Sequence, residues 1–150
     1  MELNPLTALS PIDGRYARQT DALRDIFSEC AFMNARVRVE VEWLISLSEA
    51  GFAELPHLSD HGKAFLRGLA DNFSLADCEA IKEIEKTTNH DVKAVEYWIK
   101  NQVAHDEELK SASEFVHFSC TSEDINNTSH AIMLKRGREA LADYLSLIHI

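Results

Sequence analysis

Residues 28–51 read SECAFMNARVRVEVEWLISLSEAG, and this stretch decides the fold class. Its apolar residues recur every three to four positions, which predicts one buried helical face. That face consists of Met33, Val37, Val41, Leu44 and Leu47. The alternation within residues 37–43 also fits a β-strand, but the helical period runs longer and no turn residue interrupts it. We therefore predict a helix over about 28–50, with Gly51 at the position after the helix where glycine is favoured.

The segments on either side of this stretch predict further helices, each with a start signal. Thr20 is expected to cap a short helix from Asp21, and Ser59 to begin another with apolar positions 65, 66, 69 and 73. Ser74 and Asp77 have the spacing of a capping box for a helix to about 86. Glycine and proline are scarce, and the prolines lie outside the helical patterns. The chain is predicted to be all-α.

The second half of the chain predicts two more helices, separated by a charged connection at 106–110 that marks a domain boundary. The acidic run Asp106–Glu108 within it is expected to be a solvated turn. Asp91 is expected to cap the first, and Thr121 or Ser122 the second. The predicted buried face of the first is Val92, Val95, Trp98, Ile99 and Val103. The predicted stripe of the second is Ile125, Ser129, Ile132, Gly137, Ala140, Tyr144 and Ile148. No stop signal precedes Ile150, so we expect the sequence to be cut inside a helix.

The composition is that of a folded, water-soluble domain, with 45% hydrophobic and 27% charged residues in 150. A net charge of -10 argues against nucleic-acid binding, and no apolar run reaches the roughly 20 residues that span a membrane. No signal peptide is visible, so we expect a cytoplasmic protein. Cys30, Cys78 and Cys120 are odd in number and far apart, which favours reduced thiols over a disulfide framework.

Two polar segments carry the chemistry. The first polar segment, residues 87–92, reads TTNHDV, and the second polar segment, residues 117–124, reads HFSCTSED. Each feeds a predicted helix N-terminus, where unpaired N–H groups and the helix dipole favour anions. We therefore expect a site for an anionic small molecule, with His90 as its most specific member, because a helix cap needs no imidazole.

Several simpler interpretations stay open. Residues 89–91 fit a helix-entry turn, His117 fits a core histidine, and residues 121–122 fit plain N-caps. Arg15 suits a phosphate or carboxylate, but it also suits a surface ion pair. Two weaker patterns complete the set. They are a metal site at His57, Asp60 and His61, and a thiol nucleophile at Cys120 beside His117.

Three segments of the chain, in order, resemble the bacterial adenylosuccinate lyases. They are Ser10–Tyr16, Thr87–Tyr97 and Phe115–Asn127. The wider superfamily includes fumarase, aspartase and argininosuccinate lyase, and it implies an all-α fold. By this resemblance residues 1–111 form a small N-terminal helical domain, and residues 112–150 begin a central helix bundle. Four subunits are expected to pool their bundles into a homotetramer whose active sites are shared between subunits.

The resemblance implies a β-elimination that releases fumarate from adenylosuccinate to give AMP. The same reaction would act on the succinyl-aminoimidazole-carboxamide ribotide of purine biosynthesis. A base removes a proton beside a carboxylate, and an acid protonates the departing nitrogen. The partner is a nucleotide substrate, with no metal, no cofactor, no nucleic acid and no membrane implied.

The resemblance also gives expected roles to the matching residues. Arg15 and Tyr16 would contact the nucleotide end of the substrate. The pocket would be lined by Asn89, His90 and Asp91, with His90 supporting proton transfer or substrate orientation. The succinyl end would meet Thr121 and Ser122, which bind a carboxylate, and His117, which supports that loop or reaches the pocket.

The family's flexible serine-bearing loop and its downstream histidine segment are absent from the sequence. The principal acid and base are therefore expected beyond residue 150, and residues 1–150 alone are predicted to be inactive. Two alternatives remain. One is another fumarate-releasing lyase, argininosuccinate lyase or aspartase, and the other is a non-catalytic helical oligomerisation module.

Overall fold

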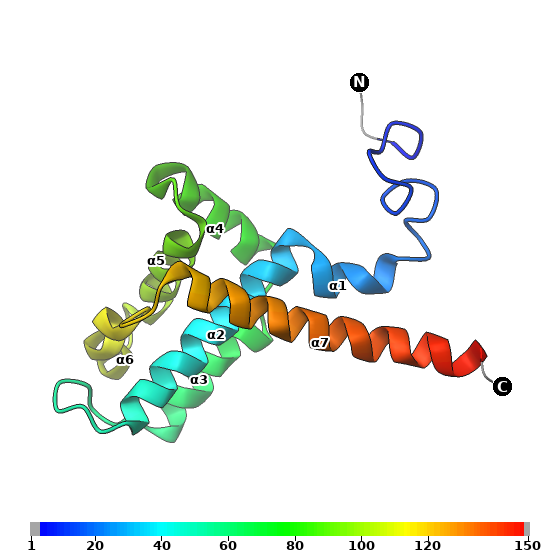
Figure 1. The fold of residues 1–150 in the computed structure, drawn as a ribbon. Helices are drawn as coiled ribbons and strands as arrows, with labels where there is room; N and C mark the ends of the chain where they lie inside the picture. The colour runs from blue at the N-terminus through cyan, green and yellow to red at the C-terminus, as the bar shows by residue number, and fades with distance from the viewer. Residues whose placement is uncertain (1–3, 149–150) are drawn as a thin grey trace.

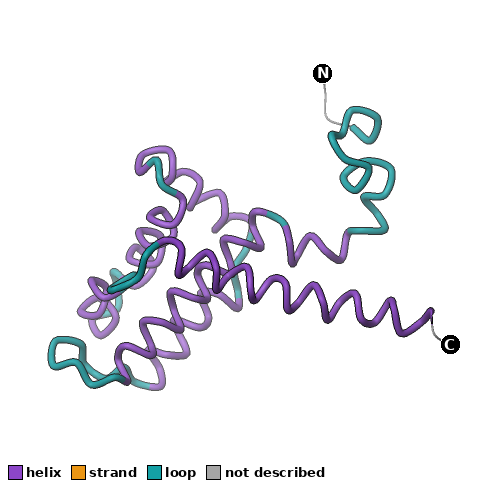
Figure 2. Tube along the Cα trace, in the orientation of Figure 1, coloured by secondary structure: helices purple, strands orange, loops and turns teal. Residues whose placement is uncertain are grey.

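The structure is a computed structural model that describes residues 4–148, without the side chains at 143, 144 and 146–148. Within those residues it contains seven α-helices, two 3-10 helices and no strand, which confirms the all-α prediction (Figures 1 and 2). The elements are η1 Asp21–Leu23, α1 Arg24–Phe27, α2 Glu29–Glu49, α3 Asp60–Asp71, α4 Leu75–Thr88, α5 Asp91–Val103, α6 Glu107–Ala112, η2 Ser113–Phe115 and α7 Ser122–Ile148.

Helix α2 lies at the centre of the molecule and contacts α1, α3, α4, α5 and α7. The predicted helical face is confirmed, because all five of its apolar residues are buried. The strand alternative is wrong, because Glu29–Glu49 form an α-helix whose buried positions follow the helical period. Ser28 caps the helix by accepting the Ala31 N–H at 3.2 Å, and Gly51 follows its end with a φ of 81°. That left-handed backbone favours glycine.

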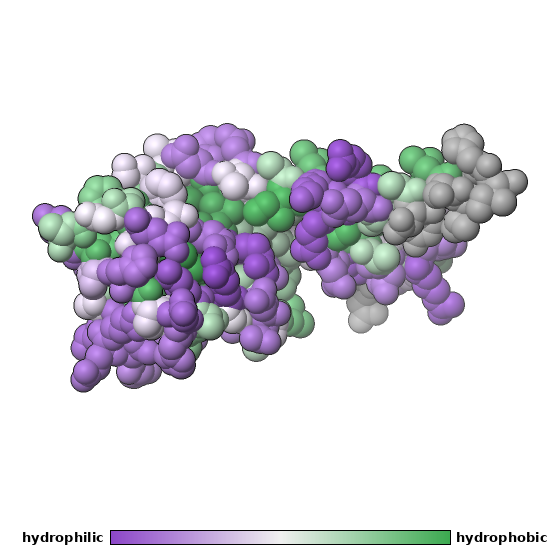
Figure 3. Space-filling model, turned by 90° about the horizontal axis from the view of Figure 1, so that it is seen from below, coloured by the Kyte–Doolittle hydropathy of each residue, from purple (hydrophilic) through white to green (hydrophobic). Residues whose placement is uncertain are grey.

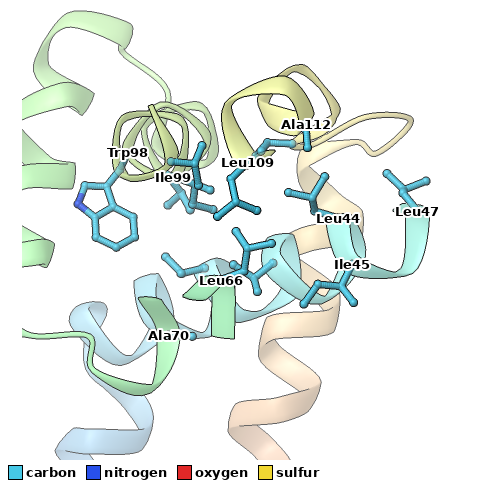
Figure 4. Packing of buried hydrophobic residues seen from close by; sticks show 14 of the residues in the cluster. Leu44, Ile45, Leu47, Leu66, Ala70, Trp98, Ile99, Leu109 and Ala112 are labelled. Atoms are coloured by element: carbon cyan, nitrogen blue, oxygen red, sulfur yellow. The ribbon is translucent and has the colours of Figure 1, made fainter. Parts of the chain in front are cut away.

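The hydrophobic core runs along most of α2, from Met33 to Leu47. Leu44 and Ile45 belong to the same cluster as Leu66 and Ala70 of α3 and side chains of α5 and α6 (Figure 4). The whole predicted face of α5 is buried. The predicted face of α3 is only partly confirmed, because Leu66 is buried but Phe65 is 37% exposed.

Helix α7 crosses α2 with its first half and then projects away from the helical body, alongside α1 (Figure 1). Gly137 allows the close approach of α1, because an added Cβ would overlap the ring of Phe27. On either side of this contact Leu134, Leu141 and Leu145 are exposed, and apolar side chains lie both on the helical body and on the projecting part of the molecule (Figure 3). From the predicted stripe, Tyr144 and Ile148 lie outside the described side chains.

The predicted start signals are mostly confirmed. Ser59 accepts the Gly62 N–H at 3.0 Å, and the Asp77 carboxylate accepts the Ser74 N–H at 2.8 Å in a capping box. The short helix from Asp21 is present as η1 followed by α1, but the prediction for Thr20 is wrong. Its hydroxyl donates to backbone carbonyls of the preceding turn instead of accepting from the helix.

The acidic run Asp106–Glu108 is not a solvated turn, contrary to the prediction, but the start of α6. Asp106 caps α6 by accepting the Leu109 N–H at 2.9 Å, and Leu109 is fully buried in the core. The Glu108 carboxylate accepts the N–H and the hydroxyl of Ser59, at 2.5 and 2.7 Å. Acidic residues here serve two helix N-termini, where the dipole favours negative charge.

The prediction of reduced thiols is wrong for one cysteine pair. Cys30 on α2 and Cys78 on α4 form a disulfide that links residues 48 positions apart. The helical packing brings the two sulfurs together, and their distance in sequence hid this.

None of the helices within residues 4–148 has the length and apolar character needed to cross a membrane.

Candidate functional site

The two polar segments meet at the N-termini of α5 and α7. The hydroxyl Oγ of Ser122 lies 3.4 Å from Nε2 of His90, although 32 residues separate them. Both side chains are accessible, since the side chain of His90 is 50% exposed and Ser122 is partly buried. Two helix N-termini with an imidazole and a hydroxyl between them make a site that favours an anion.

His90 is the N-cap of α5, and the prediction that Asp91 caps this helix is wrong. The backbone of His90 is extended, and its Nδ1 accepts the Lys93 N–H at 3.2 Å. The argument that a cap needs no imidazole therefore fails here, because this imidazole does cap. Since Nδ1 accepts, the neutral ring carries its proton on Nε2, which donates to Ser122. Asn89 ends α4 in the left-handed conformation, with a φ of 50°.

Arg36 ties both helix N-termini to α2, and the sequence analysis missed it. Its Nη2 donates to Asp91 Oδ2 at 2.6 Å, and its Nε donates to Asn126 Oδ1 at 2.9 Å. The residue is only 5% exposed, and its guanidinium lies 3.9 Å from the centre of the Phe32 ring. In the sequence Arg36 stands between Ala35 and Val37, at the start of a stretch where polar residues alternate with valines, and nothing local distinguishes it from Arg38.

Asp91 is ionised by these contacts in spite of its partial burial. Burial alone would raise the pKa of its carboxyl. The Val92 N–H and the Arg36 guanidinium outweigh that effect and hold the pKa below its ordinary value. Asp91 is therefore a fixed negative group at the start of α5, where the helix dipole also stabilises it.

His117 is also tied to α2, through Glu40. Nδ1 of His117 lies 2.5 Å from Oε1 of Glu40, and the Glu40 side chain is fully buried. A proton must lie between these two atoms, since both otherwise present lone pairs. Burial raises the pKa of Glu40, against the opposing effect of His117. His117 is thus neither an ordinary core histidine nor an unpaired side chain, because its ring is hydrogen-bonded to the buried Glu40 carboxyl.

Thr121 caps α7 together with Asp124, which settles the choice between Thr121 and Ser122. The Asp124 carboxylate accepts the Thr121 N–H at 2.7 Å and its hydroxyl at 2.9 Å. These two hydrogen bonds lower the pKa of Asp124 below its ordinary value. Ser122 is the first residue of α7, so its hydroxyl remains available at the helix N-terminus.

Two cavities border this region. One of about 470 Å³ is lined by α2 residues, including Arg36, and by Asn89, His90 and Asp91. The other, of about 550 Å³, lies between α2 and α7 and reaches Ser119, Cys120 and Asp124. Burial raises the pKa of the Cys120 thiol, with Glu40 and Asp124 adding to the effect, which is the opposite of an activated nucleophile.

Arg15 and Tyr16 are the predicted site residues that the fold keeps apart from the others. Both are exposed in the N-terminal segment, at the opposite end of the molecule from the junction of α4 and α5 (Figure 1). The Arg15 guanidinium lies 4.5 Å from the centre of the Tyr16 ring. Within one chain the N-terminal segment therefore lies apart from the two polar segments (Figure 1).

The weak metal pattern at His57, Asp60 and His61 does not form a cluster. Nδ1 of His57 lies 3.2 Å from the carbonyl oxygen of Ser48. Across residues 4–148, no group of three histidine, cysteine or acidic side chains is arranged to hold a metal ion.

Comparison with known proteins places the chain in a family. A family model described as lyase matches residues 14–149, which is most of the chain. The chain therefore belongs to this lyase family.

Similar curated relatives are adenylosuccinate lyases. That of Vibrio cholerae serotype O1 is 56% identical over 142 residues, covering 94% of this chain and 31% of the relative. That of Haemophilus influenzae is 56% identical over 140 residues, and that of Escherichia coli K12 is 53% identical over 140, each covering 93% and 31%. The chain thus spans about a third of the length of the curated relatives it matches.

Proposed function

We propose that this chain supplies part of the substrate site of an adenylosuccinate lyase, which releases fumarate from adenylosuccinate and leaves AMP. The contact between His90 Nε2 and Ser122 Oγ carries the proposal, because it joins the two polar segments into one anion-binding site. The family match and the relatives' names support the reaction class. The same site would act on the succinyl-aminoimidazole-carboxamide ribotide.

The two ends of the substrate would be bound by different groups. The Ser122 hydroxyl and the first N–H groups of α7 suit a succinyl carboxylate, and Thr121, whose own hydroxyl donates to Asp124, holds this helix N-terminus in place. Nε2–H of His90 would donate to the same anion, since Nδ1 is already occupied by the Lys93 N–H. We therefore assign His90 to orientation and charge stabilisation. The reaction breaks the C–N bond and forms a C=C bond, and its principal acid and base would come from outside residues 1–150.

A second subunit would supply the nucleotide end. Arg15 and Tyr16 lie too far from His90 to act within one chain, but they are exposed and carry a guanidinium fork suited to phosphate. A homotetramer with shared sites would bring them to a neighbour's pocket. The exposed leucines of α7 support such an assembly, since apolar surface on a projecting helix favours a partner. Residues 1–111 and 112–150 would then be a helical domain and the start of the shared bundle, in the cytoplasm.

The leucines of α7 also favour the alternative of a non-catalytic oligomerisation module. The two functions differ in what the polar segments do. A module of that kind would tolerate alanine at His90 and Ser122 without any loss of function, whereas a lyase would not.

A chimera tests the proposal. Residues 1–150 replace the matching segment of the Vibrio cholerae relative, and fumarate release is measured with adenylosuccinate, argininosuccinate and aspartate. We expect release from adenylosuccinate only, and none from the 150-residue chain by itself. A folded chimera that is inactive on adenylosuccinate would overturn the proposal, and so would one that prefers another substrate. Light scattering on the same chimera reports whether it is a tetramer.

A further inference from the structure

Glu40 is a buried acid that the proposed reaction does not use directly. It lies on α2 with no exposed surface, and its Oε1 is 2.5 Å from Nδ1 of His117. Its second oxygen, Oε2, is buried and has no hydrogen-bond partner among the described residues. A carboxyl buried in this way destabilises the folded state, and an apolar side chain of similar volume would destabilise it less. The contact with His117 therefore needs a reason other than stability.

The loop that His117 begins is held in an uncommon conformation. His117 and Ser119 have φ values of 64° and 61°, in the left-handed region that side chains other than glycine rarely adopt. Such a backbone persists only when surrounding contacts fix it. Helix α2 provides two of these contacts from successive turns. Glu40 holds the His117 ring, and Trp43 Nε1 donates to the Phe118 carbonyl at 2.8 Å.

This strained loop leads directly into the anion site. Four residues after His117 stands Thr121, the cap of α7, followed by Ser122, whose hydroxyl reaches His90. The path from Glu40 to the site is therefore short and continuous: a buried carboxyl, an imidazole, a fixed turn and a helix N-terminus. The charged and titratable groups near this path are Glu96, Cys120 and Asp124.

We propose that Glu40 is a positioning residue, which acts through His117 to set Thr121 and Ser122 for binding the dicarboxylate half of the substrate. The inference rests on the proposed function and adds a residue that touches no substrate. It makes a specific claim about the two products. Loss of Glu40 weakens the binding of fumarate, which carries the two carboxylates. It leaves the binding of AMP unchanged, because AMP carries neither of them.

The test is product inhibition of the chimera with Glu40→Gln. We expect the inhibition constant for fumarate to rise about tenfold, the size expected for one charge-assisted hydrogen bond. The inhibition constant for AMP should change less than about twofold, because AMP has no succinyl carboxylate for the N-terminus of α7 to bind. A merely structural role would weaken both products together. Equal changes, or no change, would overturn the proposal.

Two further variants complete the experiment. Glu96→Gln removes another buried carboxyl, one paired with Lys93 and Lys100 on α5, and should leave the fumarate constant unchanged. If Glu40→Gln does not fold, His117→Gln breaks the same contact from the partly exposed loop and must give the same split between products. An unmutated chimera without activity would remove the proposed function, whereas an active chimera without the split removes only the role of Glu40.

Discussion

Arg36 Nη2 lies 2.6 Å from Asp91 Oδ2, and this ion pair joins the central helix to the first residue of α5. Its two ends differ, because the side chain of Arg36 is 6% exposed and that of Asp91 is 48% exposed. The arginine side chain thus lies in the interior. The aspartate side chain faces both the interior and the cavity that Asn89 and His90 also line. Whatever occupies that cavity meets a carboxylate whose position α2 determines.

Replacing Arg36 by alanine should destabilise the chain by about 2–3 kcal/mol, because two hydrogen bonds and the packing on Phe32 are lost. Arg38→Ala is the matched control. Its ion pair with Asp71 is solvent-exposed on both sides, so the loss should stay below about 1 kcal/mol. Urea unfolding of both variants measures the difference. Equal losses would contradict the burial argument.

Variants of His90 separate its role as a cap from its role in the site. His90→Ala removes the acceptor for the Lys93 N–H and should cost about 1 kcal/mol of unfolding free energy. His90→Asn restores an excellent cap, and stability should return with it.

Activity of the chimera should not return with asparagine, because an amide cannot replace the imidazole at the anion site. We expect both variants to lose about a hundredfold in fumarate release, the size expected when one donor that stabilises negative charge is removed. Recovery of activity as well as stability in His90→Asn would reduce His90 to a helix cap.

The unfolding free energy of the chain should depend on pH partly through the titration of Glu40. Burial raises the folded-state pKa of this carboxyl above its ordinary value of 4.5. The folded state therefore holds the proton more tightly, and this contribution to stability is lost as pH rises from about 4.5 through the folded pKa. Asp91 has the opposite sign, since its lowered pKa adds stability that is lost as pH falls through that value.

Unfolding free energies of the chain and of Glu40→Gln, measured from pH 4 to pH 8, isolate the first effect. The difference between them should shift in favour of the glutamine variant as pH rises. A difference independent of pH would show that Glu40 does not change its proton binding on folding.

Reduction of the Cys30–Cys78 disulfide should lower the unfolding free energy by about 2–4 kcal/mol, because the bond closes a long loop in the unfolded chain. Cys30→Ser should match the effect of dithiothreitol, and Cys120→Ser should have little. Thiol titration of the oxidised, denatured chain should count one free thiol. A count of three would contradict the pairing.

Periodicity alone predicted the longer helices well, because most of them bury one regular face on their neighbours, but it missed the short α6, where the acidic run predicted a turn. The faces of α2 and α5 needed no knowledge of the partner helices. The site was predicted less completely. Asn89, His90 and Ser122 could be selected because polar residues crowd before helix starts, but Arg36 and Glu40 could not. Their importance comes from what lies across the fold, and a polar residue on a helix looks the same whether it faces water or another helix.

The disulfide and the cap at His90 were missed for related reasons. Cys30 and Cys78 become neighbours only when α2 and α4 pack, which no local pattern encodes. A histidine cap runs against the usual preference for short polar side chains, and the aspartate beside it offered the more ordinary choice.

Arg36 and Glu40 stand one helical turn apart, and each holds one of the two polar segments. Four residues of helix advance about 6 Å along the axis, and a hydrogen-bonded helix of this length hardly stretches. The spacing of Arg36 and Glu40 on α2 therefore fixes the offset between the two polar segments. The two segments cannot slide past each other along α2, so His90 and Ser122 stay side by side at the anion site.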